Sequence, residues 1–256
     1  MIYGFVGTGT ITAAMIDGMM ASTLDVKKVL VSPRNAGTAE ALSQRYGKVE
    51  IAGDNQAVAD AADVLILAVR PQVAKDVLSS LRIPPQAKLI SVIAATHHVD
   101  VASWTGRPES AIVRAIPLPF LARHEGVTAI FPGERTARNF FGALGEVVEC
   151  MDQNEFDLMA AASSMMGTYF GLMEIVSGWL ADKGMTNETA RRYLTPLYSS
   201  LAHVATATPH ASYCDLRQEF STRGGLNEQL FRMFDVQGGS AALLKALDDV
   251  LARLRK

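Results

Sequence analysis

The stretch MIYGFVGTGTIT, residues 1–12, places a short apolar run directly before a glycine-rich segment that continues into helix-forming sequence. The pattern predicts a buried strand over residues 2–6 and a helix over residues 10–20. Gly7 permits a tight turn between them, and Gly9 lets the backbone approach a pyrophosphate. The amino end of the helix supplies amide donors and a positive dipole end. The stretch therefore predicts a Rossmann-type dinucleotide site, with a glycine turn that holds no ligand as the alternative.

The third position of this glycine fingerprint is Thr12, where glycine or alanine is usual. A small residue there allows the helix to pack closely on the sheet. We therefore expect Thr12 to loosen that packing slightly.

The rest of the first half alternates short aliphatic runs with helical segments, which is typical of a parallel sheet with crossover helices. Further strands are expected at residues 28–32, 64–68, 88–93, 111–115, 127–131 and 146–150, and helices at 36–46 and 72–81. Beyond Asp152 only helices are expected, at residues 155–181, 187–207, 213–220, 227–234 and 240–254. The predicted fold is α/β, with a Rossmann domain over residues 1–151 and an all-helical domain over residues 152–256.

Composition narrows the class of partner. The chain has 256 residues, of which 49% are hydrophobic, and its net charge of −2 does not support the basic surface of a nucleic-acid binder. Cys150 and Cys214 stand too far apart in sequence to suggest a disulfide framework or a zinc site. We therefore expect a small-molecule substrate and no metal. We also expect a cytoplasmic location, because the first residues do not resemble a secretory signal.

An uncharged stretch at residues 158–173 raises the question of a membrane helix. It is shorter than the roughly 20 apolar residues that span a bilayer. A helix buried in a core or between subunits is the expected explanation.

The segment VSPRN, residues 31–35, bears on the choice of cofactor. NAD enzymes usually place an acidic residue here to hold the adenosine ribose, and Ser32 takes that position. Arg34 and Asn35 follow and offer a cation and donors to a 2′-phosphate. NADPH is therefore favoured over NADH, unless Arg34 is only a solvated loop charge.

Several motifs in order along the chain resemble those of pyrroline-5-carboxylate reductases. DVLILAVRPQ at residues 63–72 resembles their strand and turn, which usually has lysine where Arg70 stands. Asn55, SVIAA at 91–95, RAIPLP at 114–119 and GGLNEQ at 224–229 match in the same order. The resemblance covers essentially the whole chain.

The resemblance implies NADPH-dependent hydride transfer to a cyclic imine carboxylate, giving proline or a close relative. It implies a helical domain that interleaves with a second subunit, so that the protein is at least a homodimer with each active site between two domains. Together with the glycine motif, it implies cofactor contacts at Gly7, Thr8, Gly9, Thr10, Ile11, Ser32, Arg34, Asn35, Asn55, Ala68, Val69, Arg70, Pro71 and Ala94.

The substrate loop is implied at residues 220–227, and there the chain departs from the family. The family's SPGGTT reads TRGGLN at residues 222–227, and its SGSGPAY reads SSMMGTY at residues 163–169. Substrate binding is expected from Arg223, Gly224, Gly225, Leu226 and Asn227, with Thr222 and Asn227 as candidate catalytic residues. The alternative is a noncatalytic NADPH-binding regulator whose substrate loop has drifted.

A third hypothesis is an oxidoreductase acting on a keto or hydroxy acid. Hydroxyacid dehydrogenases of similar architecture supply a lysine early in the second domain, and residues 155–182 contain none. An imine also needs less help from a protein acid, since its protonated form already carries positive charge. His97 and His98, after the strand at 88–93, are expected to be a solvent-exposed loop pair, with a cofactor-side role as the alternative.

Overall fold

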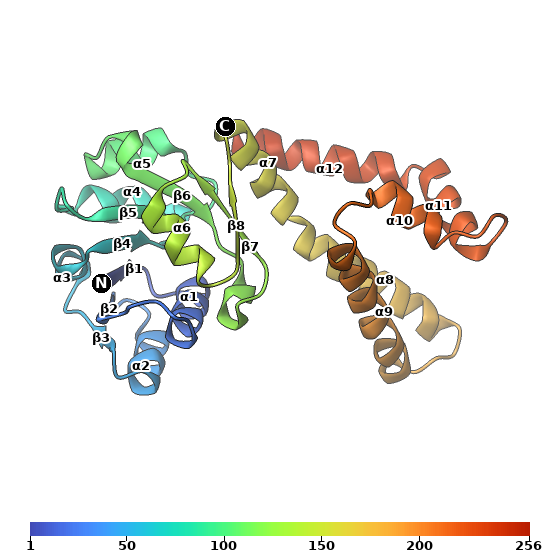
Figure 1. Ribbon diagram of the computed structural model, residues 1–256, viewed down its shortest axis with the longest axis horizontal. Helices are drawn as coiled ribbons and strands as arrows, with labels where there is room; N and C mark the ends of the chain where they lie inside the picture. The colour runs from blue at the N-terminus through green and yellow to red at the C-terminus, as the bar shows by residue number, and fades with distance from the viewer. The chain divides into compact units, whose positions relative to one another are not determined.

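The structure is a computed structural model that describes residues 1–256, and the chain divides into two compact units, Met1–Ala160 and Ala161–Lys256. The first unit contains one eight-stranded sheet with the order β3-β2-β1-β4-β5-β6-β7-β8 (Figure 1). Only the pairing of β6 with β7 is antiparallel. The strands are β1 (Ile2–Val6), β2 (Lys28–Val31), β3 (Val49–Ile51), β4 (Val64–Leu67), β5 (Lys88–Ser91), β6 (Ile112–Ile116), β7 (Val127–Phe131) and β8 (Glu146–Glu149).

Helices cover both faces of the sheet, as the crossover pattern predicts. Buried side chains of α1, α2 and α6 form one apolar cluster, and those of α3, α4 and α5 form another (Figure 1). In β1, Tyr3 and Phe5 belong to the first cluster and Val6 to the second, as the pleat requires. The helices are α1 (Thr10–Ala21), α2 (Ala36–Arg45), α3 (Asn55–Ala61), α4 (Pro71–Ser79), α5 (His98–Thr105), α6 (Arg135–Gly142) and α7 (Gln153–Ser163), with short 3₁₀ turns η1 (Glu109–Ala111) and η2 (Pro119–Arg123).

The strand order reverses at β1, which has β2 on one side and β4 on the other. Such a switch point leaves a crevice at the carboxyl ends of the strands, where open α/β sheets bind their ligands. The predicted α/β class is confirmed, and β7 and β8 extend the sheet at its edge as expected. The sequence prediction missed β3 and the helices α3, α5 and α6; β3 has three residues and buries only Val49.

The second unit is helical and contains α8 (Met165–Asp182), α9 (Asn187–Ala207), α10 (Tyr213–Glu219), α11 (Leu226–Val236) and α12 (Gly239–Leu254). The single helix predicted over residues 155–181 is in fact two, α7 and α8, separated at Ser164. The amide and the hydroxyl of Ser164 both donate to the carbonyl of Ala161, at 3.1 and 2.6 Å. The break therefore lies inside the altered SSMMGTY segment. No helix of the chain combines the length and the apolar character that crossing a membrane requires.

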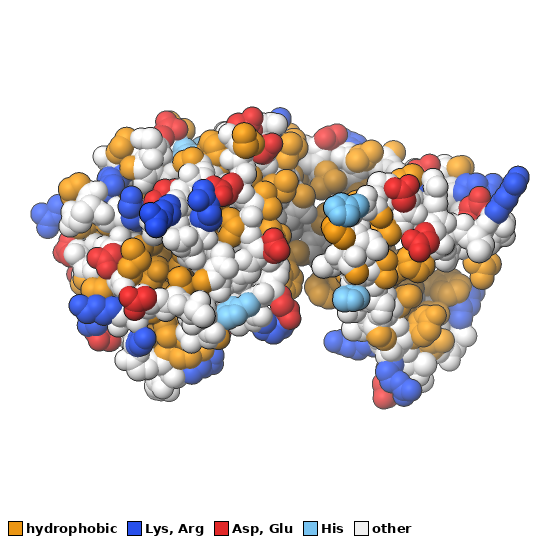
Figure 2. All heavy atoms as spheres, viewed as in Figure 1, with side chains coloured by type: hydrophobic (Ala, Val, Ile, Leu, Met, Phe, Trp, Pro, Cys, Tyr) orange, Lys and Arg blue, Asp and Glu red, His pale blue; other side chains and the backbone are white.

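Apolar side chains of the second unit are largely exposed (Figure 2). Its buried apolar residues are Ala161, Ala190 and Leu194. Large side chains such as Phe170, Ile175 and Trp179 of α8 are 65%, 69% and 58% exposed. A unit of this size that buries so little apolar surface lacks an adequate core of its own.

Candidate functional site

A pocket of about 600 Å³ opens at the carboxyl ends of β1, β4 and β5. Its wall contains every residue predicted to contact the cofactor except Ser32 and Asn55, together with Val73 and Val92, which the sequence prediction missed. Val73 directly follows the motif at residues 63–72 and lies in the first turn of α4, and Val92 lies within the SVIAA motif, directly after β5. The lining residues are Gly7, Thr8, Gly9, Thr10, Ile11, Arg34, Asn35, Ala68, Val69, Arg70, Pro71, Val73, Val92 and Ala94.

The two glycines of the turn between β1 and α1 have different physical roles. Gly7 has a φ of +106°, and a Cβ atom there would lie 2.5 Å from the carbonyl oxygen of Ala68. Only glycine fits this close approach between the β1–α1 and β4–α4 turns. Gly9 has an ordinary φ of −97°, and a Cβ atom there would meet nothing within 4 Å. Gly9 therefore opens onto free space, which is the requirement for close approach of a ligand.

Side chains behind the glycine turn hold it in place. The Ser32 hydroxyl accepts from the amide of Gly7 at 2.9 Å, and the Thr8 hydroxyl donates to the Ser32 carbonyl at 2.7 Å. Asn35 donates from its side-chain amide to the carbonyl of Thr8 at 2.9 Å. Because Ser32 is only 1% exposed, it supports the turn from behind and does not line the pocket. Asn35 both lines the pocket and holds the turn.

Thr12 makes a contact that its sequence position did not suggest. Its hydroxyl donates to the carbonyl of Gly7 at 2.7 Å, and the residue is fully buried. This bond ties the first turn of α1 to the glycine turn.

The pocket is suited to an anion. Arg34 and Arg70 are the charged residues of its wall, and no carboxylate lines it. Both arginines are exposed, and neither forms a salt bridge. Gly9 begins α1 without a side-chain cap, so the first-turn amides of α1 have no side-chain acceptor from this position. Two unpaired cations and a helix amino end therefore face one pocket.

Asn55 is not one of the residues that line this pocket. It is the first residue of α3, a helix capped by Asp54, whose carboxylate accepts from the amide of Ala57 at 2.7 Å. Asn55 follows β3, which is the outermost strand on that side of the sheet.

His98 is not the solvent-exposed residue that the sequence predicted. It is 6% exposed, with Nε2 3.0 Å from the carbonyl oxygen of Ile112 and Nδ1 3.4 Å from Oε1 of Gln153. Gln153 in turn donates to the carboxylate of Asp157 at 2.6 Å, and Asp157 lies 3.9 Å from the Arg114 guanidinium. The prediction failed because the partners of the His98 ring, on β6, β7 and α7, lie far along the chain. This polar chain ties α5 and β6 to α7 within the first unit.

Burial lowers the pKa of His98 below its ordinary value. The unfolded chain therefore takes up this proton before the folded chain does, and the free energy of unfolding should decrease as the pH falls below about 6.5. Uptake of one proton by the unfolded chain lowers the free energy of unfolding by at most about 1.4 kcal/mol per pH unit. We expect His98→Gln to remove this contribution to the pH dependence of the free energy of unfolding. Urea denaturation at a series of pH values from 7.5 to 5 measures it. His203→Gln, at an exposed histidine of α9, is the control and should keep the wild-type slope. Equal slopes in His98→Gln and wild type would contradict this role.

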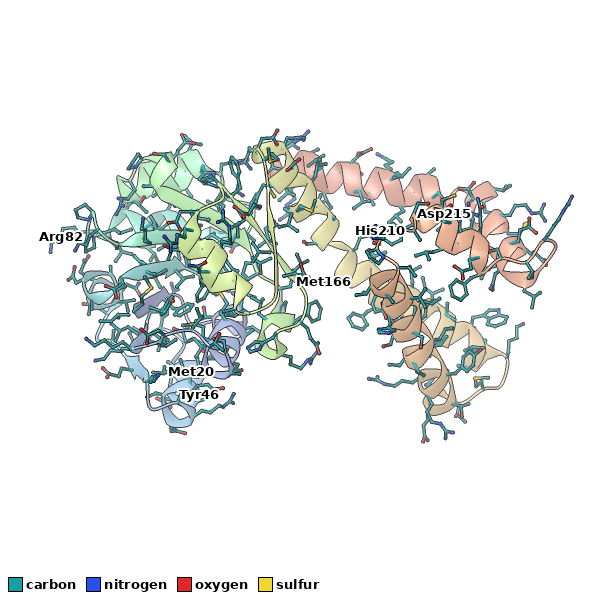
Figure 3. All side chains as sticks on the ribbon, viewed as in Figure 1. Met20, Tyr46, Arg82, Met166, His210 and Asp215 are labelled. Carbon is teal, nitrogen blue, oxygen red and sulfur yellow. The ribbon has the colours of Figure 1, made fainter.

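His210 lies in the segment between α9 and α10 and is exposed, as is His203 (Figure 3).

The predicted substrate loop lies between α10 and α11 in the second unit. Asn227 closes it by donating from its side-chain amide to the carbonyl of Phe220 at 2.6 Å. The amide of Gly225 donates to the carbonyl of Thr222 at 2.8 Å. Gly224 has a φ of +74°, and its amide donates to the carboxylate of Glu228. The amides of Gly224 and Gly225, two of the residues expected to bind the substrate, therefore have acceptors within the chain.

The side chains of this loop remain available. Arg223 is exposed and forms no salt bridge, and Leu226 is 82% exposed. Asn227 uses one hydrogen of its amide to close the loop, which leaves the second hydrogen and the oxygen. Glu228, whose role was not predicted, was within the quoted GGLNEQ motif, but its contact with Gly224 depends on the loop conformation.

Comparisons with known proteins agree over most of the chain. The family model described as NADP oxidoreductase coenzyme F420-dependent matches residues 2–95. The pyrroline-5-carboxylate reductase of Haemophilus influenzae is 25% identical over 98% of this chain and 96% of its own length. The solved pyrroline-5-carboxylate reductase of Coxiella burnetii is 25% identical, with a TM-score of 0.80 over 99% of this chain and 97% of its own. The pyrroline carboxylate reductase of Plasmodium falciparum, solved with NADP bound, has a TM-score of 0.80 at 16% identity, covering 98% of this chain and 96% of its own.

Proposed function

Because the chain belongs to the pyrroline-5-carboxylate reductase family, we propose that it reduces pyrroline-5-carboxylate, or a closely related cyclic imine carboxylate, to the corresponding cyclic amino acid. The observation that carries the proposal is the pocket at the switch point of the sheet. There a glycine turn, a helix amino end and two unpaired arginines face the same space. These features suit a nicotinamide dinucleotide, whose pyrophosphate needs close backbone approach and amide donors.

When bound, the dinucleotide supplies the hydride. The amides at the start of α1 would hold its pyrophosphate, with Gly9 leaving room for close contact and Gly7 fixing the turn. Ser32, Thr8 and Thr12 keep this turn rigid through buried hydrogen bonds. The energy of ordering the turn is thus supplied by folding and not by the ligand.

We further propose that the preferred cofactor is NADPH. The turn after β2 has no acidic residue to hold the ribose hydroxyls, because Ser32 occupies that position and is turned inward. Arg34 lines the pocket two residues later and is free to form charge-assisted hydrogen bonds with a 2′-phosphate.

The substrate would be held by residues 222–227. Arg223 offers a positive charge to its carboxylate, and Asn227 and Thr222 offer hydrogen bonds to the carboxylate or the imine nitrogen. The imine carries its own positive charge when protonated, so hydride transfer needs no strong acid from the protein. This is consistent with α7 and α8, which contain no lysine.

We propose a homodimer formed through the helical domain, residues 152–256, with residues 1–151 as the cofactor-binding domain. The exposed apolar side chains of the second unit support this, because large contiguous apolar surfaces of stable proteins are usually covered by a partner. The free thiols of Cys150 and Cys214 suit a reducing cytoplasm.

Replacing Ile175 with aspartate should weaken this dimer. Ile175 lies in α8 and is 69% exposed, so a carboxylate there would lose its solvation in an apolar interface. Sedimentation velocity over a concentration series should show the dimer dissociating at least tenfold more readily. Val99→Asp, at a residue of α5 that is 59% exposed in the first unit, should leave the dimer intact. Equal effects of the two substitutions would argue against the helical interface.

The direct test is NADPH oxidation by the purified protein with a panel of cyclic imine acids led by pyrroline-5-carboxylate, with keto acids as controls. Turnover of imines alone supports the reductase. Tight NADPH binding without turnover of any panel member would instead favour a noncatalytic, cofactor-binding regulator.

A further inference from the structure

We propose that Glu228 is a specificity-determining residue that lowers the preference of this chain for imines bearing a carboxylate, relative to imines without one. This inference rests on the proposed function, because it concerns the loop that would hold the substrate. Neither the α/β fold nor the glycine motif determines the preference between imines with and without a carboxylate.

The key contact is made by a carboxylate of the chain itself. Glu228 lies in the first turn of α11, and its carboxylate accepts a hydrogen bond from the amide of Gly224. Gly224 is held in the left-handed region with a φ of +74° and is the residue before the cap, Gly225. The amide of Gly225 is already bonded to the carbonyl of Thr222. Gly224 therefore presents its amide to a carboxylate, and Glu228 supplies one.

The charge of Glu228 is not neutralised by an ion pair. Glu228 and Arg223 are both exposed, and neither forms a salt bridge. A substrate carboxylate that approached this loop would meet a fixed negative charge and would have to displace it from the Gly224 amide. A ring of the same size without a carboxylate would not compete for that amide. Its protonated imine would be attracted by the same charge.

The discrimination therefore follows from one side chain. Glu228→Gln keeps the length of the side chain and an oxygen that can accept from Gly224, but it removes the charge. Charged acceptors hold an amide more strongly than neutral ones, so the glutamine should be displaced more easily. Binding of a carboxylate-bearing imine should improve by about tenfold.

The experiment compares pyrroline-5-carboxylate with 1-pyrroline, the same ring without the carboxylate, at saturating NADPH. We expect Glu228→Gln to raise the ratio of kcat/KM for pyrroline-5-carboxylate to kcat/KM for 1-pyrroline by about tenfold, mainly through KM for the acid. Glu188→Gln is the matched control, since Glu188 also lies in the first turn of a helix, α9, outside the loop. Its ratio should equal that of wild type. An unchanged ratio in Glu228→Gln would overturn the inference while leaving the reductase activity standing.

A binding measurement separates failure of this inference from failure of the proposed function. If wild type reduces neither imine, the proposed function fails. Titration of the NADP⁺-loaded protein with proline then tests Glu228 without turnover. Proline binding about tenfold tighter in Glu228→Gln, and also in Glu228→Ala, supports the inference, and unchanged binding in folded variants overturns it. Melting temperatures of both variants establish that they are folded, and if Glu228→Gln fails to fold, Glu228→Ala decides the result.

Discussion

Replacing Arg34 with alanine is expected to raise the KM for NADPH by about 10- to 100-fold while leaving the KM for NADH nearly unchanged. Arg34 lines the pocket proposed to hold the cofactor, is exposed and has no ion-pair partner, so its guanidinium is free to bind a 2′-phosphate. Only NADPH carries that phosphate, and loss of a charge-assisted bond should therefore be specific to it. Steady-state kinetics with both cofactors measures the two constants.

Two further variants define the role of Arg34. Arg34→Lys keeps the charge but not the planar fork of donors, and should recover part of the affinity for NADPH. Arg82→Ala removes an exposed arginine outside the pocket, labelled in Figure 3, and should change neither constant. Equal losses for NADPH and NADH in Arg34→Ala would exclude the 2′-phosphate assignment.

The second large effect is expected from Gly7→Ala, which should lower the free energy of unfolding by about 3–5 kcal/mol. Gly7 has a φ of +106°, and its Cβ atom would lie 2.5 Å from the Ala68 carbonyl oxygen. Two backbone turns would have to separate, and the hydrogen bond from the Gly7 amide to Ser32 would be strained. Urea denaturation measures the loss.

Gly9→Ala is the matched control, because it places the same methyl group two residues away. Gly9 has an ordinary φ and free space where the Cβ atom would lie, so stability should change by less than about 1 kcal/mol. The methyl group would project toward the pocket, and NADPH affinity should fall at least tenfold, as measured by the fluorescence of the bound nucleotide. A stable Gly7→Ala variant, or Gly9→Ala with unchanged affinity, would contradict these separate roles.

The sequence around the glycine turn predicted the local structure because the turn depends on residues that are adjacent in sequence. Gly7 and Gly9 are separated from the strand and the helix by no more than a residue, so strand, turn and helix could be recognised together. Arg34 was predicted from its place after β2, and Arg70 from the resemblance of the strand and turn at residues 63–72, which contain β4. Strand ends of a parallel sheet meet at one edge, which is why segments far apart in sequence line one pocket.

Ser32 and His98 show what local sequence could not reveal. Ser32 directly follows β2 and His98 begins α5, and both were expected near ligand or solvent. Ser32 turns inward because the Gly7 amide needs an acceptor, and buried His98 contacts Ile112, Phe131 and Gln153, which lie 14 to 55 positions away. The direction of each side chain depends on a partner supplied by the assembled fold.

The sequence by itself determined the α/β class, the position of the proposed dinucleotide site and the all-helical character of the second half, because periodicity and turn chemistry act over a few residues. Only the tertiary structure decided that Ser32 supports the turn from behind, that the long helix breaks at Ser164, and that the Glu228 carboxylate takes the Gly224 amide. These features depend on which donors and acceptors the folded backbone brings within reach of one another, and residue order alone does not specify that geometry.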